Sequence, residues 1–170
     1  RLTAGYCWPW SKPATDGTLV DDVQIGRWAR PWNARPDSGR LASGIPKSHL
    51  WASESGGIDQ VGCIYTAQGF EFDYAGVIFG SDLVYRPREG WVVHPEDSYD
   101  NGLKRGTQPD LLAALIKNTY RVLLSRGLKG CYVYFMDEET RNFFESRMET
   151  PYPLSQTQHL RVAEGGNTDG

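Results

Sequence analysis

Two short apolar runs enclose a long helical pattern, and this order constrains the fold more than any other feature of the chain. The first run, Tyr74–Gly80, ends at a glycine, and the second, Gly130–Phe135, is rich in aromatic residues. Between them, apolar residues recur at helical spacing from Leu111 to Leu123, after a proline that suits a first helical turn. Strands joined through a helix are typically parallel. The sequence therefore predicts an α/β domain with a mostly parallel sheet and helices on both faces.

Shorter patterns predict the remaining elements. Strands are expected at Arg1–Tyr6, Asp22–Trp28 and Gln60–Tyr65, and an inserted β-hairpin at Leu83–Arg86 and Trp91–His94. A helix is expected at Glu138–Arg147 with Asp137 as its cap, a short helix at Ser48–Ser53, and loops over most of Ala34–Gly57 and at Asp97–Gly106. We expect one domain over residues 1–150 and a polar, extended or disordered tail over 151–170.

Composition excludes several classes of protein. The net charge of −3 argues against binding nucleic acid by bulk charge, although a local basic groove stays possible. Cys7, Cys63 and Cys131 are odd in number and far apart, which favours free thiols in a reducing compartment. The chain opens without a signal peptide and has no apolar run of the roughly 18 residues that a membrane span needs. We therefore expect a cytoplasmic protein without a membrane partner.

Metal and hydrolytic sites are not indicated. His49, His94 and His159 are scattered, with no cysteine or aspartate at metal-ligand spacing. No arrangement of serine, histidine and aspartate supports a nucleophilic enzyme.

The segment Tyr65–Asp73 has groups suited to a nucleotide or a polynucleotide. Gly69 allows close approach of the backbone, Thr66 and Gln68 can donate hydrogen bonds to phosphate or sugar, and the Glu71 carboxylate can accept them from sugar hydroxyls. We expect the segment at the carboxyl end of a parallel strand, where open α/β sheets bind ligands. The alternative is a strand-to-helix turn with a structural glycine.

Two arginines near the end of the long helix are candidates for binding phosphate. Arg126 precedes Gly127, so its planar, always-charged guanidinium can project from the helix end toward a phosphate. Arg121 is a weaker candidate. The alternative for Arg126 is a cation placed to interact with the helix dipole.

In combination these segments resemble motifs V and VI of superfamily-one helicases. Motif V is similar to Tyr65–Asp73, and motif VI is similar to Tyr120–Gly127. The resemblance implies a RecA-like second domain of the P-loop NTPase type, with Thr66 and Gln68 contacting nucleic acid. It implies that Gly69, Glu71 and Arg121 contact nucleotide, and that Arg126 is the catalytic arginine finger. No Gly-x-x-x-x-Gly-Lys-Ser/Thr phosphate loop occurs in the chain, so the chain is expected to be half of a split site.

Sequence segments outside the two motifs resemble one family more closely. The segments Ala4–Trp10, Arg30–Asn33, Gly57–Gln60 and Leu115–Tyr120 are similar to the C-terminal half of the Schlafen-group-three-like DNA/RNA helicase domain family, a bacterial family of unknown function. The similarity covers about residues 1 to 147. It implies ATP and Mg²⁺ as cofactors of the intact protein, an N-terminal P-loop domain as partner, and single-stranded DNA or RNA as ligand. The function is then an ATP-dependent helicase or translocase; the alternative is an ATP-driven switch or binding module without unwinding.

The tryptophan-rich segments have two interpretations. Trp8, Trp10, Trp28 and Trp32 could stack on bases, or they could pack under the long loops as a satellite core, with Arg30 and Asn33 fixing the loop.

Overall fold

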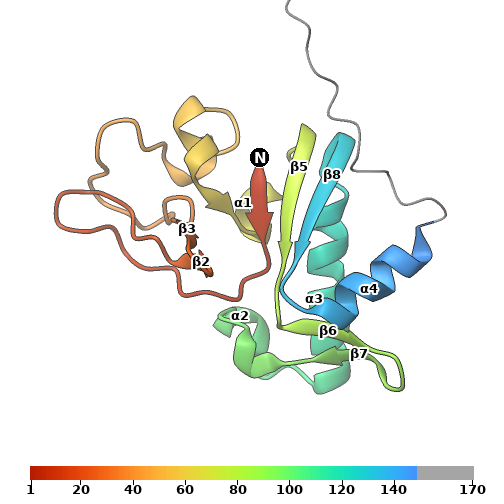
Figure 1. Ribbon diagram of the computed structural model, residues 1–170. Helices are drawn as coiled ribbons and strands as arrows, with labels where there is room; N and C mark the ends of the chain where they lie inside the picture. Colours follow the sequence, from red (N-terminus) through yellow and green to blue (C-terminus); the bar gives the residue numbers. More distant parts are fainter. Residues whose placement is uncertain (149–170) are drawn as a thin grey trace, which may run out of the picture.

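A parallel sheet of four strands lies at the centre of the computed structural model, which describes residues 1–148 (Figure 1). The strand order is β4 (Val61–Gly62), β1 (Leu2–Ala4), β5 (Phe72–Phe79) and β8 (Gly127–Phe135). Leu2 pairs with Val61 on one side and with Gly76 on the other, so the first strand of the chain lies inside the sheet. The predicted α/β class and the parallel sheet are confirmed, and the arrangement is compatible with a RecA-like fold.

Helices cover one face of this sheet. Val77 and Phe79 of β5 point into a core with the buried face of α3 (Pro109–Leu124), and Phe79 stacks on Tyr120 with ring centroids 3.8 Å apart. Residues of α1 (Ile64–Ala67), α2 (Asn101–Lys104) and α4 (Glu138–Arg147) pack against the same core. The apolar stripe of α3 therefore faces the sheet as its spacing predicts.

The opposite face is covered differently from our expectation. Within residues 1–148, Ala4 and Ile78 pack there against the hairpin of β2 (Val23–Ile25) and β3 (Trp28–Arg30) and against tryptophan-rich loops. Figure 1 shows this hairpin on the left, away from α3 and α4. The prediction of helices on both faces is thus wrong for the described residues, because a hairpin and large aromatic side chains supply the apolar cover on this side.

Three local predictions also need correction. Asp22–Trp28 forms a hairpin instead of one strand, because Gly26 takes a φ of +57° at the first position of a two-residue turn. Gln60–Tyr65 is a strand only at Val61–Gly62, since a capping box at Cys63 starts α1. Asp97–Gly106 contains α2 and adjoins the short η3 (Pro95–Asp97) instead of being only loop.

The other local predictions agree with the structure. The hairpin of β6 (Leu83–Arg86) and β7 (Gly90–Val93) follows β5, and the loop over residues 34–57 holds only the short η1 (Ser48–Leu50) and the start of η2 (Ser55–Asp59). The Asp137 carboxylate caps α4 by accepting a hydrogen bond from the Thr140 amide at 2.8 Å.

Some expectations concern the chain as a whole. Cys7, Cys63 and Cys131 are all free thiols. Among the described residues, no helix combines the length and apolar character that crossing a membrane requires. The predicted polar tail over 151–170 lies outside the described residues.

Candidate nucleotide and nucleic-acid site

The turn between α1 and β5 contains most of the predicted motif V residues. Gln68, Gly69 and Glu71 are all exposed there. Gly69 has a φ of +86°, and a Cβ built on it would meet nothing within 4 Å, so the space above its backbone is open. Open space and a left-handed glycine allow another molecule to approach this backbone closely. The geometry therefore agrees with the expected nucleotide contacts at Gly69 and Glu71 but does not require them.

Thr66 is held by the fold more firmly than predicted. Its hydroxyl accepts a hydrogen bond from the Cys63 amide at 3.1 Å and lies 3.0 Å from Oδ1 of the buried Asn33. This capping box fixes the start of α1 and ties it to the segment after β3. Thr66 is only half buried, so one side of the residue still faces solvent.

Arg126 lies directly beside this turn, although 56 residues separate it from Phe70. Its guanidinium donates to Val122 O at 3.0 Å, to Phe70 O at 3.3 Å and to the Ser125 hydroxyl at 3.0 Å. The backbone joins the same segments, because the Phe72 amide donates to Arg126 O at 2.9 Å. The structure thus brings the two predicted motifs together.

The position of this contact differs from our expectation. Thr66 follows the carboxyl end of β4, as predicted. Gly69, Glu71 and Arg126, however, precede β5 and β8, so they lie at the amino ends of those strands. The short α1 returns the chain across the sheet before the motif ends. The contact between the motifs is therefore at the opposite edge from the one the general rule for α/β sheets indicates.

Arg121 is not part of that contact. Its Nη1 donates to Oδ1 of Asn118 at 2.9 Å, one turn earlier in α3. Its side chain lines a cavity of about 380 Å³ together with Lys117 of α3 and Phe144 of α4. The structure therefore places Arg121 in a different environment from the turn at Gly69.

Tyr120, next to Arg121, anchors the C-terminal part of α3 at the carboxyl end of β5. Its buried hydroxyl accepts a hydrogen bond from the Gly80 amide at 2.8 Å and donates to Asp82 Oδ1 at 2.5 Å. Burial raises the pKa of the Asp82 carboxyl and also the pKa of the Tyr120 hydroxyl. The Cys7 thiol, 3.9 Å from the Tyr120 oxygen, likewise has a pKa raised by burial. Sequence patterns gave no signal for this network, since its members come from three separate segments.

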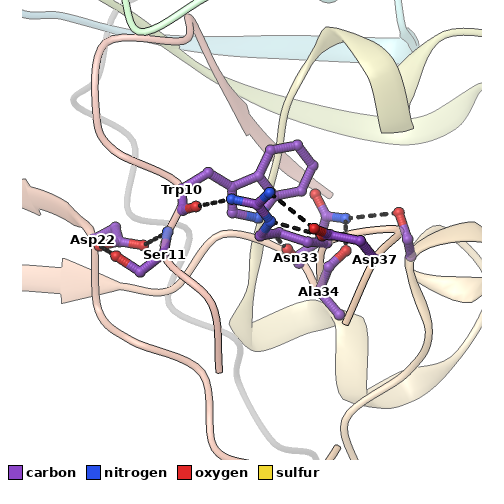
Figure 2. A network of polar contacts seen from close by, with 8 residues as sticks. Trp10, Ser11, Asp22, Asn33, Ala34 and Asp37 are labelled. Carbon is purple, nitrogen blue, oxygen red and sulfur yellow. Dashed lines mark hydrogen bonds and ion pairs between the residues drawn. The ribbon is translucent and has the colours of Figure 1, made fainter. Parts of the chain in front are cut away.

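The tryptophans pack as a satellite core. Trp32 is 1% exposed and makes edge or tilted contacts with Tyr6, Trp8 and Trp10. Trp10 Nε1 donates to Asn33 O at 2.7 Å, and Figure 2 shows these two residues together at the centre of the polar network. The predicted loop contacts are made by Asn33, whose amide donates to Ala34 O at 3.0 Å. Among the described residues, the Arg30 guanidinium donates only to the carbonyl of its neighbour Ala29, at 3.2 Å. A base-stacking platform of these four tryptophans is therefore not what the structure shows.

A groove beside α1 was not predicted. It has a volume of about 490 Å³ and lies between the turn after α1 and the loop that leads from Asn33 to η1. Thr66 and Gln68 line one wall, and Arg35, Lys47 and His49 line the other. The signal in the sequence was weak, because these basic residues are dispersed in a loop of mixed polarity.

Comparisons with known proteins agree with part of the predicted identity. The family model described as "Schlafen group 3, DNA/RNA helicase domain" matches residues 1–137. An uncharacterized protein of Saccharomyces cerevisiae is 36% identical over 97 residues, which are 54% of this chain and 21% of the yeast protein. The chain thus spans about a fifth of the length of that relative. No solved structure matches. The chain belongs to the Schlafen group 3 DNA/RNA helicase domain family.

Proposed function

We propose that the chain is the C-terminal RecA-like half of an ATP-dependent helicase or translocase, with Arg126 as its arginine finger. The observation that carries this proposal is the contact between Arg126 and the turn around Phe70. A guanidinium has five N–H donors, and three of them are used by Val122, Phe70 and Ser125. The remaining donors are available to a phosphate, while the three bonds hold the group in place. Such preorganisation is what stabilises charge that develops in a transition state.

The nucleotide would lie between this edge and a second domain. ATP needs a phosphate loop and Mg²⁺ ligands, and the N-terminal half of the protein would supply both. The open space at Gly69 suits close approach of the nucleotide, and the exposed Glu71 carboxylate can accept hydrogen bonds from the ribose. Closure of the two halves would then bring Arg126 to the terminal phosphate. Thr66 and Gln68, at the other end of the same short segment, would transmit closure to bound nucleic acid.

The test is ATP hydrolysis by the longer protein that contains both halves. Arg126→Ala and Arg126→Lys should both lower kcat strongly, by about 10³-fold or more for the alanine variant, because a finger acts on the transition state. ATP affinity should change little. Arg121→Ala is the matched control, since within residues 1–148 the Arg121 guanidinium bonds only to Asn118 of α3.

Each outcome has a clear meaning. A kcat for Arg126→Lys within about twofold of the parent would refute the finger role, because lysine lacks the planar fork that arginine presents. Thermal unfolding of each variant separates lost chemistry from lost fold. Stimulation of hydrolysis by single-stranded DNA or RNA is expected of a helicase or translocase, whereas its complete absence would favour a switch without unwinding. The 170-residue chain alone should not turn over ATP.

A further inference from the structure

We propose that the groove beside α1 binds one single strand of nucleic acid, with Lys47 contacting phosphate and Tyr65 and Phe70 stacking on bases. This inference rests on the proposed function only in assigning nucleic acid to the segment after β4. It names a wall that the helicase motifs do not include, namely the loop with Arg35, Lys47 and His49. It also names the two aromatic side chains that would carry the bases.

The charge of the groove favours a polyanion. Among residues 1–148, its lining includes Arg35, Lys47 and His49 but no carboxylate, although the chain as a whole has a net charge of −3. A cavity of about 530 Å³ beside β3 differs in this respect, because two carboxylates, Asp21 and Asp59, line it together with one cation, Arg30. The charge of the lining therefore favours a phosphate backbone in the groove beside α1 over the cavity beside β3.

The arginine and the lysine that line the groove, Arg35 and Lys47, have different roles. Arg35 forms a bidentate ion pair with Asp37, with N···O distances of 2.8 and 3.1 Å, and its Nη1 donates to Trp10 O at 2.7 Å. Its guanidinium therefore mainly holds the loop. Lys47 is exposed and makes no ion pair within residues 1–148. The ammonium of Lys47 is thus the cation available to phosphate.

The aromatic side chains give the groove a surface for bases. Tyr65 is 52% exposed and Phe70 is 40% exposed, although both are large apolar residues. The Tyr65 hydroxyl donates to Asp100 Oδ2 at 2.6 Å, so its ring is held in place before any ligand arrives. Because every base has a π-face, stacking on such rings tolerates any sequence and needs unpaired bases. A duplex hides those faces, so the groove fits a single strand.

Phe70 also connects this groove to the proposed nucleotide edge. Its side chain lines the groove, whereas its carbonyl oxygen accepts the hydrogen bond from Arg126. A base stacked on Phe70 would therefore bear on the backbone that positions the guanidinium. A single residue, Phe70, would therefore connect the bound nucleic acid to the Arg126 guanidinium.

The experiment is binding of fluorescein-labelled oligo(dT) and oligo(U) of about 12 nucleotides to the 170-residue chain, without nucleotide, followed by anisotropy. Phe70→Ala should weaken binding about tenfold, the loss expected for one stacked base. Lys47→Gln should lower the slope of log K against log salt by about 0.7, as for one lost phosphate contact on a single strand. Lys117→Gln on α3 and Tyr132→Ala on β8 are the matched controls and should bind like the parent chain.

Several results would overturn the proposal. These are no binding by the parent chain, equal competition by a duplex of the same length, or control variants that weaken binding as much as the groove variants. Circular dichroism identifies variants that fail to fold, and for them Phe70→Leu, which keeps apolar bulk but loses the ring, replaces the alanine variant. Because no ATP is present, these outcomes are independent of the role of Arg126.

Discussion

Replacement of Tyr120 by phenylalanine should destabilise the protein strongly, although it removes only one oxygen atom. Its hydroxyl is fully buried and bonds the Gly80 amide and the Asp82 carboxyl. Tyr120→Phe keeps the ring stacked on Phe79 but leaves both groups without this partner. Each buried polar group that loses its partner costs about 1–3 kcal/mol, so for the two groups we expect a loss of about 2–6 kcal/mol. In a domain of this size each kcal/mol lowers Tm by about 2–4 °C.

The assay is urea and thermal unfolding followed by circular dichroism. Tyr132→Phe is the matched control: Tyr132 is 70% exposed, and its variant should stay within about 0.5 kcal/mol of the parent. A Tyr120→Phe variant that is equally stable would refute the reasoning, because it would mean that the two buried groups find other partners at no cost. A changed urea m-value would instead indicate an altered unfolded or native state.

Two further predictions concern the same sheet. Burial raises the pKa of Asp82 in the folded state. The contribution of this carboxyl to the free energy of unfolding is therefore complete below its unfolded pKa of about 3.9, and it is lost as the pH rises through the raised folded pKa. Urea unfolding measured across pH should show this decline in stability, and Asp82→Asn should abolish the decline. Gly62→Ala would place a Cβ in steric conflict with the Trp51 ring and should cost about 1–3 kcal/mol. Gly69→Ala meets open space, so its strained φ alone should cost about 1 kcal/mol, and unfolding that ranks these two variants in reverse order would contradict this.

The elements with strong periodicity were predictable from the sequence. Apolar residues of α3 recur at helical spacing, which indicates a helix. The runs of β5 and β8 are short, adjoin glycines and are rich in aromatic residues, and these properties together indicate strands. The hairpin at β6 and β7 was predictable as well, because a glycine-containing loop separates two β-rich runs. The contact between Arg126 and Phe70 follows the predicted pairing of motifs but not the predicted edge of the sheet.

Features that depend on tertiary packing were not predictable. The hairpin of β2 and β3 covers Ile78 because the loops that carry it run over that face of the sheet. No local sequence pattern specifies which face of the sheet these loops cover. The network at Tyr120 and the groove at Lys47 each combine segments far apart in sequence. Their residue types alone, a tyrosine in a helix and a lysine in a loop, are too common to indicate a site.

The inner position of β1 has a consequence for how the chain folds during synthesis. The Thr3 hydroxyl donates to the Gly76 carbonyl, 73 residues later, and both neighbours of β1 are made after it. At about 5–20 residues per second, a ribosome needs roughly 4–15 seconds to make that stretch. For most of this interval neither β4 nor β5 has been made, so neither can pair with β1. The central sheet therefore forms late: β1 is paired on both sides only after β5 emerges, and β8 is added only after α3 has been made. Nascent chains halted before β5 should be substrates for chaperones.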